Sequence, residues 1–147
     1  MKAWKLLILV FGLMLFAGSA TAQQDAGRPL TATLTGAAEV PGPGDSDGAG
    51  TATIRINQGK NQVCYELRVS NIAAATLAHI HSGGPTVAGP VVITLTPPTT
   101  GSSSGCVENV DAEVIKQLRQ KPGDYYVNIH NADFPDGAVR GQLAKGM

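Results

Sequence analysis

Alternation of apolar and polar residues runs through the chain and predicts a series of short β-strands. The segment 63–69 shows it most clearly, because Val63, Tyr65 and Leu67 share one parity and the residues between them are polar or cysteine. Successive side chains of a strand point to opposite faces, so this pattern predicts a strand with one buried face. Comparable segments lie at residues 31–40, 51–56, 77–81, 91–96, 125–131 and 138–144.

Turn-forming residues separate these segments, and one helix interrupts them. Segments rich in Gly, Pro, Asn, Asp and Ser lie at 41–48, 57–60, 82–85 and 134–137, and a longer loop is expected at 97–105. A helix is expected over residues 111–120, where Asp111 can cap the N-terminus and three apolar residues form one stripe. The last two strands are expected to form a hairpin. Together these elements predict an all-β antiparallel domain, either a sandwich or a barrel, with one short helix.

The first 22 residues do not follow the β pattern and resemble a secretory signal peptide. Two lysines precede an apolar run over residues 6–17, and Ala20–Ala22 provides the small residues of a cleavage site. The run is too short to span a membrane, so we expect cleavage after residue 22 and a periplasmic or secreted protein. Residues 23–29 would form a flexible tail before one domain over residues 30–147.

Charge narrows the possible function classes. The whole chain has 11 basic and 11 acidic residues, and loss of Lys2 and Lys5 with the signal peptide would leave a slight acidic excess. This balance, without a basic run, argues against nucleic-acid binding. No second apolar run is long enough to cross a membrane, so no span is expected after signal cleavage.

The chain has two cysteines, Cys64 and Cys106. Export would place them in an oxidising compartment, where an even number of cysteines favours one disulfide. Closing a loop of this length would stabilise the fold by about 4 kcal/mol. The alternative is that one thiolate joins the histidines as a metal ligand.

All three histidines of the chain lie in two of the predicted strands. His79 and His81 are two residues apart, so their side chains point to the same face of a strand. His130 has the parity opposite to that of its apolar neighbours Val127 and Ile129. If the apolar residues face the core, all three histidines lie on the solvent side of a sheet or at its rim.

Three imidazoles on adjacent strands could hold one transition-metal ion at about 2 Å. Such a site suits Cu(II) or Zn(II), and imidazole does not choose between them. Asp133 and the Asn128 amide could support the site or add a ligand, and Arg140 and Gln142 would lie beside it. The alternative is that the histidines hydrogen-bond the glycine-rich loop after His81 and hold its shape.

Two pairs of strings resemble the two signatures of the CHRD domain family, named for its occurrence in chordin. They are AHIHSG (78–83) with GPVV (89–92), and YVNIH (126–130) with FPDGAVRGQL (134–143). Residues 64–67 and 104–106 also resemble those of exported bacterial members that consist of a single domain. The resemblance covers about residues 30–143 and implies an immunoglobulin-like or related Greek-key β-sandwich.

The resemblance supplies no catalytic residue, so the histidines carry the functional hypotheses. The leading one is an exported binding module that holds a single copper or zinc ion through His79, His81 and His130. The second is a metal-free domain that interacts with a protein or a glycan outside the cytoplasm. The third is a mononuclear copper redox enzyme distantly similar to copper/zinc superoxide dismutase; a two-metal dismutase site needs about six histidines and is excluded by their number. A binding role is favoured over an enzymatic one.

Overall fold

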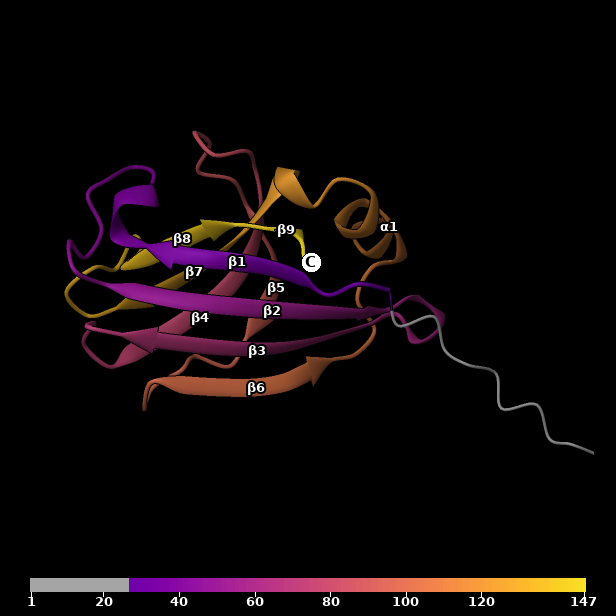
Figure 1. Cartoon of the computed structure of the whole chain (residues 1–147), viewed down its shortest axis with the longest axis horizontal. Coiled ribbons are helices and arrows are strands. Elements are labelled where there is room, and N and C mark those ends of the chain that lie inside the picture. Colours follow the sequence, from indigo (N-terminus) through magenta and orange to yellow (C-terminus); the bar gives the residue numbers. More distant parts are fainter. Residues whose placement is uncertain (1–26) are drawn as a thin grey trace, which may run out of the picture.

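The computed structural model describes residues 27–147, so the expected signal peptide and most of the expected tail lie outside the described residues. This part of the chain forms an all-β fold with one α-helix, as the sequence predicts (Figure 1). The strands are β1 (Leu30–Thr35), β2 (Ala49–Asn57), β3 (Gln62–Ser70), β4 (Ala75–Ser82), β5 (Val91–Leu95), β6 (Ser102–Val107), β7 (Tyr125–Asn131), β8 (Val139–Gln142) and β9 (Ala144–Lys145). The helix is α1 (Ala112–Gln120), and three short 3-10 helices are η1 (Gly36–Ala38), η2 (Gln58–Lys60) and η3 (Pro122–Asp124).

The strands form one antiparallel sheet in the order β5-β4-β7-β8-β1-β2-β3-β6, and β9 pairs with β1. The sheet curls so that β4 and β5 lie behind β2 and β3 (Figure 1). Near the two edges the Ser103 hydroxyl of β6 donates to the Thr96 carbonyl, just after β5, over 2.7 Å. The fold is therefore nearly a barrel. The immunoglobulin-like Greek-key sandwich is not confirmed, because the strands belong to one continuous sheet.

Apolar side chains from alternating strand positions fill the inside of the curled sheet. In β3, Val63, Tyr65 and Leu67 are buried, which confirms the alternation read from the sequence. The core also contains Leu34, Ile54, Ile80, Val127, Ile129, Val139 and Leu143. One face of each strand therefore points into a shared core, and the opposite face of β4 and β7 is left for polar residues.

The predicted helix and its cap are confirmed by α1. The Asp111 carboxylate accepts hydrogen bonds from the backbone N–H groups of Glu113 and Val114, which satisfies two free donors of the first turn. Ile115 and Leu118 are fully buried, so the apolar stripe of the helix packs against the core. The helix lies at one end of the curled sheet (Figure 1).

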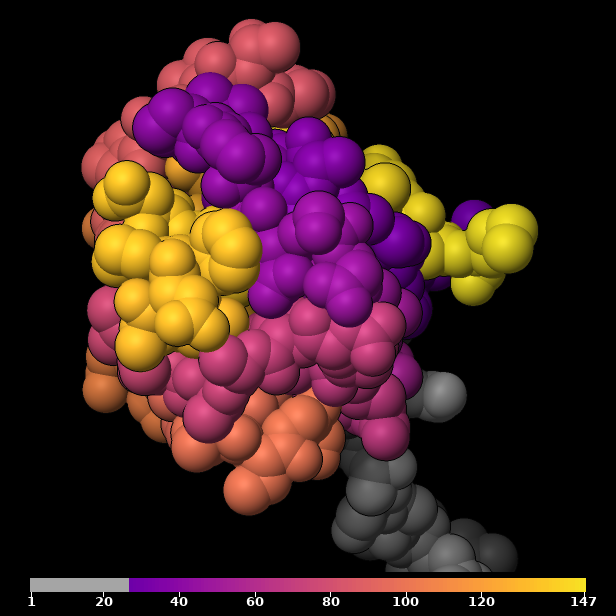
Figure 2. All heavy atoms as spheres, turned by 90° about the vertical axis from the view of Figure 1, so that its left-hand side faces the viewer, coloured from indigo at the N-terminus to yellow at the C-terminus, as the bar shows by residue number. Residues whose placement is uncertain are grey.

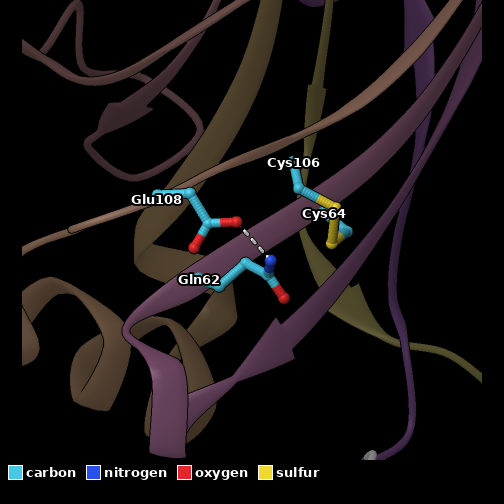
Figure 3. Close-up of a disulfide and its surroundings, with 4 residues drawn as sticks. All are labelled: Gln62, Cys64, Cys106 and Glu108. Carbon is cyan, nitrogen blue, oxygen red and sulfur yellow. Dashed lines mark hydrogen bonds between the residues drawn. A yellow bond between two sulfur atoms is a disulfide. The ribbon is translucent and has the colours of Figure 1, made fainter.

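The loop predicted over residues 97–105 is wrong in its second half, where the chain forms β6. This strand pairs with β3, with Cys64 directly opposite Cys106. The two cysteines form a disulfide, beside a hydrogen bond between Gln62 and Glu108 (Figure 3). The disulfide excludes the alternative in which a free thiolate joins the histidines.

Candidate metal centre

Neighbouring strands β4 and β7 bring the three histidines together. Their antiparallel pairing places His79 opposite Asn128 and His81 opposite Tyr126, and His130 lies further along β7. The alternate residues of both strands face the core. The three histidines therefore share the outer face of the curled sheet, as their parity predicts.

This outer face is covered rather than open to solvent. Every residue of β7 is buried, and His81 and His130 keep only 9% and 8% of their surface exposed. The loop 83–90, which follows β4, covers part of the face, because the Gly89 N–H donates to the Tyr126 hydroxyl over 3.0 Å. The histidines thus lie on the side of the sheet away from the core, as expected, but His81 and His130 are buried there and His79 is half-buried.

Two further loops meet next to this face. The loop 36–48 follows β1, and the loop 131–138 joins β7 to β8; the Asp45 N–H donates to the Ala138 carbonyl over 2.9 Å. Figure 2 shows this end of the molecule, with the indigo and purple segment packed against the yellow one. The contact between these loops covers the end of the sheet at which β7 ends, one residue after His130.

Hydrogen bonds to backbone carbonyls determine which ring nitrogen of His81 and of His130 carries the hydrogen. Nδ1 of His81 lies 2.9 Å from the Gly89 carbonyl oxygen, and Nδ1 of His130 lies 2.9 Å from the Pro135 carbonyl oxygen. A carbonyl only accepts, so both Nδ1 atoms carry hydrogen, and in each neutral ring Nε2 keeps a lone pair. The His81 Nε2 atom is buried and has no hydrogen-bond partner in the described part of the chain. The lone pair of His81 Nε2 is therefore available to a metal, whereas that of His130 Nε2 accepts a hydrogen bond from Nδ1 of His79, which an ion would replace.

The distances between the imidazole nitrogens are compatible with a shared ion. One nitrogen from each histidine belongs to a group whose members lie within 4.8 Å of one another. Nδ1 of His79 and Nε2 of His130 are 3.3 Å apart. Two nitrogens bound to one tetrahedral ion at about 2.0–2.1 Å would lie about 3.4 Å apart, so this pair already has the required spacing. The widest spacing in the group exceeds it, so the rings would close slightly around an ion.

Electrostatics favour the neutral form of the imidazoles, which is the form that binds metal. Burial lowers the pKa of His79, and the neighbouring His130 and His81 lower it further. Burial also lowers the pKa of His81 against the opposing effect of the Gly89 hydrogen bond, with His130 and Arg140 adding to the decrease. At neutral pH both rings are uncharged.

Tyr126 stacks on the His81 ring and helps to fix its orientation. The two rings are nearly parallel, with an angle of 7° and 4.9 Å between centroids. The Arg140 guanidinium carbon lies 3.5 Å from the Tyr126 centroid. Because β4 and β8 flank β7, the imidazole and the guanidinium approach the tyrosine from opposite sides.

Arg140 and Gln142 of β8 hold the covering loop in place. Nη2 of Arg140 donates to the carbonyls of Gly84 and Val87 over 2.8 and 3.0 Å. The Gln142 amide donates to the Gly83 carbonyl over 2.6 Å. The prediction that both residues lie beside the histidines is confirmed, although Arg140 is only 1% exposed.

Sequence reasoning missed Glu39, which lies directly after η1. This residue is 5% exposed, and both carboxylate oxygens lack a hydrogen-bond partner among the described residues. Burial raises its pKa to about 7, although Arg140 and Asn128 act in the opposite direction. Asn128 pairs with His79 on one side and with Arg140 on the other. Because Asn128 and Arg140 also act on Glu39, these polar residues connect the histidines to Glu39. No motif in the sequence around Glu39 signals this burial.

The two supporting residues expected from the sequence behave differently. Asp133 is exposed, and the group of possible metal ligands found in residues 27–147 consists of the three histidines without it. Asn128 is buried next to His79, and its Oδ1 atom has no hydrogen-bond partner in that range. Asn128 thus retains the position expected for a supporting residue, and Asp133 does not.

Comparison with known families agrees with the resemblance read from the two histidine strings. A family model described as CHRD domain matches residues 30–143, which include β1 to β8 and all three histidines. No curated protein matches the chain. In the described range no helix has the length and apolar character needed to cross a membrane.

Proposed function

This chain belongs to the CHRD domain family, and from that premise we propose that it is an exported binding module for one copper or zinc ion. The ligands are His79, His81 and His130. The observation that carries this proposal is the arrangement of nitrogens: two Nδ1–H groups are held by backbone carbonyls, and one nitrogen from each histidine belongs to a group within 4.8 Å. An imidazole whose other nitrogen donates to a carbonyl is the usual form of a metal-binding histidine.

Export is part of this proposal, with a signal peptide over residues 1–22, a tail over 23–29 and the domain over 30–147. It is supported by the composition of the first 22 residues and by the Cys64–Cys106 disulfide. Disulfides persist in oxidising compartments and are rare in the cytosol. A periplasmic or secreted location follows.

The donor set fits copper or zinc. Three neutral imidazoles suit both Cu(II) and Zn(II), and a tetrahedral ion held by three ligands keeps one position for water or another molecule. The bound metal would supply that open position, while Gly89, Pro135 and Tyr126 orient the imidazoles. These residues act before any metal arrives, because their contacts with His81 and His130 are already formed.

Calorimetric titration of the purified exported protein with Cu(II) and Zn(II) tests the proposal. We expect one ion per chain with affinity better than micromolar. His81→Ala and His130→Ala should each lower the affinity at least tenfold, because each removes one of three ligands. Asp133→Asn is the matched control: it changes a nearby exposed polar residue outside the histidine group and should leave the affinity unchanged.

Two results would contradict the metal proposal. One is the absence of stoichiometric binding by the folded protein. The other is binding that His81→Ala leaves intact, since the ion would then use other ligands. Circular dichroism of each variant separates loss of a ligand from loss of the fold.

The second candidate is a metal-free interaction domain, in which the histidines have a structural role. The hydrogen bonds from His81 to Gly89 and from His130 to Pro135 favour it, because they tie two loops to the sheet without an ion. In that case His81→Ala lowers the free energy of unfolding, and neither chelator nor metal changes the melting temperature of the parent protein. A metal-binding module instead melts at a higher temperature with Cu(II) or Zn(II) than with chelator.

A further inference from the structure

Three basic side chains surround an open hollow. It lies at the end of the molecule that carries α1 and β9, and Figure 1 shows these two elements. The hollow has a volume of about 260 Å³ and lies between the start of β1, the end of β2, the last turn of α1 and β9. Its lining consists of Gly27, Arg28, Leu30, Ile56, Arg119 and Lys145. None of these residues belongs to the candidate metal centre.

None of the three basic side chains at this hollow forms an ion pair within residues 27–147. The ion pairs of that range are Arg68 with Glu66 and Lys116 with Glu113, and no lining residue is acidic. The side chains of the three lining cations also form no hydrogen bond within the range. Their donors are therefore free to bind an anion.

The distribution of charge over the whole domain points in the same direction. The loops 36–48 and 131–138, at the opposite end in Figure 1, carry the carboxyl groups of Asp45, Asp47, Asp133 and Asp136. These four acidic side chains lie far from the three basic side chains of the hollow, while Asp111, Glu113 and Asp124 lie at the α1 end of the molecule. The acidic loops therefore do not repel an anion from the hollow at close range.

The floor of the hollow is apolar. Leu30 is 4% exposed, and Ile56 is half-buried and packs against the core. An inorganic anion would use only the basic rim, whereas a ligand with an apolar group beside its charge would contact rim and floor together. A volume of about 260 Å³ is slightly below the range of about 300–1,000 Å³ for drug-sized ligands, so the ligand is small or inserts one end.

We propose that this hollow binds a small amphiphilic anion. Its phosphate or carboxylate group contacts the three basic side chains, and its short apolar group covers Leu30 and Ile56. Guanidinium groups recognise such anions through paired N–H donors, and Arg28 and Arg119 provide two of them. The same chemistry occurs in a free alkyl phosphate and in the headgroup region of an anionic lipid.

Titration calorimetry of the purified exported protein in low salt, with chelator present, tests the proposal. Hexyl phosphate is the probe. The two comparison ligands are inorganic phosphate, which has the charged group alone, and hexanol, which has the alkyl group without the charge. We expect hexyl phosphate to bind at least fivefold more tightly than inorganic phosphate, because burial of even two CH₂ groups favours it by more than that factor. Hexanol should not bind measurably, and added salt should weaken the binding of hexyl phosphate.

Charge-removing variants assign the binding to the hollow. Arg119→Gln and Lys145→Gln should each lower the affinity for hexyl phosphate about threefold, and the double variant about tenfold, as expected for exposed charge pairs. Arg55→Gln is the matched control, because it removes an exposed positive charge of β2 outside the lining. Thermal melts verify that each variant folds like the parent protein.

Three outcomes would overturn the proposal: no binding of hexyl phosphate, equal binding of hexyl and inorganic phosphate, or a double variant that binds like Arg55→Gln. Cosedimentation with phosphatidylglycerol vesicles then distinguishes the source of the ligand. Sedimentation that depends on Arg119 identifies a lipid headgroup, and binding of hexyl phosphate without sedimentation identifies a free ligand. Both results support the shared chemistry, and neither depends on the metal proposal.

Discussion

Glu39 places a carboxyl group inside the fold with no hydrogen-bond partner for either oxygen among the described residues. Burial raises its pKa from 4.5 to about 7. The folded protein therefore holds a proton that the unfolded chain releases between these two values. The contribution of Glu39 to the free energy of unfolding is fully present below about pH 4.5. It is lost as the pH rises through about 7.

Glu39→Gln tests this account, because glutamine has a similar shape and never ionises. At pH 8 the variant should be more stable than the parent protein by up to about 3 kcal/mol, and at pH 4 the difference should disappear. Urea unfolding at the two pH values measures it. The exposed Glu108→Gln should show no such pH dependence, and an equal effect of Glu39→Gln at both values would point to packing instead.

The proposed metal site should keep its affinity to a lower pH than ordinary histidines would. The pKa values of His79 and His81 are lowered below 6.5, so protons compete for these rings at a lower pH than for ordinary histidines. We expect the Zn(II) affinity to change little just below pH 7.5 and to fall as the pH is lowered further towards 5.5. Calorimetry across this range is the measurement, and a decrease that begins above pH 7 would contradict the lowered pKa values.

Parity along a strand was sufficient to predict which residues share a face with the histidines. The alternation is a local property, so Arg140 and Gln142 could be placed beside the site from their own segment alone. Burial of this face could not be predicted in the same way. The covering loop is held by Arg140, which lies 56 residues from its partner Gly84.

Among the elements, β6 was the strand that its own sequence did not reveal. Residues 102–107 consist of three serines, a glycine, a cysteine and a valine, most of which do not favour strands. The strand exists because β3 pairs with it and because Cys64 is bonded to Cys106. In contrast, α1 was predictable because its cap and its apolar stripe are encoded within ten residues of each other.

Loss of the disulfide should therefore affect β6 first. The cysteines are separated by 42 residues, so removal of the bond should lower the free energy of unfolding by about 4 kcal/mol. We expect the amides of β6 to exchange faster in the Cys64→Ser/Cys106→Ser variant, while those of β2, inside the sheet, keep more of their protection. Hydrogen exchange with mass spectrometry measures both.

Reduction of the parent protein by a thiol provides the control for this double variant. It removes the same bond without changing the sequence, so the two samples should show the same pattern of exchange. If β6 and β2 lose protection together, the disulfide stabilises the whole sheet rather than its edge.

At the scale of the molecule, strand patterns could predict an all-β domain and could not predict its closure. The same alternating segments fit a sandwich or a barrel, because strand order depends on contacts between distant segments such as β1 and β8. The family signatures likewise cover the strands without stating how they are ordered. The near-barrel arrangement required the structure.

The proposed export makes a prediction for the whole chain. The mature protein should begin at Gln23, which the intact mass of the exported protein will show. A variant that lacks residues 2–22 should stay in the cytosol, and its Cys64 and Cys106 should react with a thiol-alkylating reagent after rapid quenching. An exported protein that retains residue 1 would contradict the proposed cleavage.

The pairing of β1 with β8 and β9 has a consequence for the order in which the protein can fold. If the chain emerges N-terminus first, β1 is present long before β8 and β9, with which it pairs. His130 and Arg140 also emerge after most of the other strands of the sheet. The group of histidines can therefore assemble only after almost the whole domain has been delivered. If the chain crosses a membrane unfolded, the metal supply of the destination, rather than that of the cytosol, determines which ion the proposed site would capture.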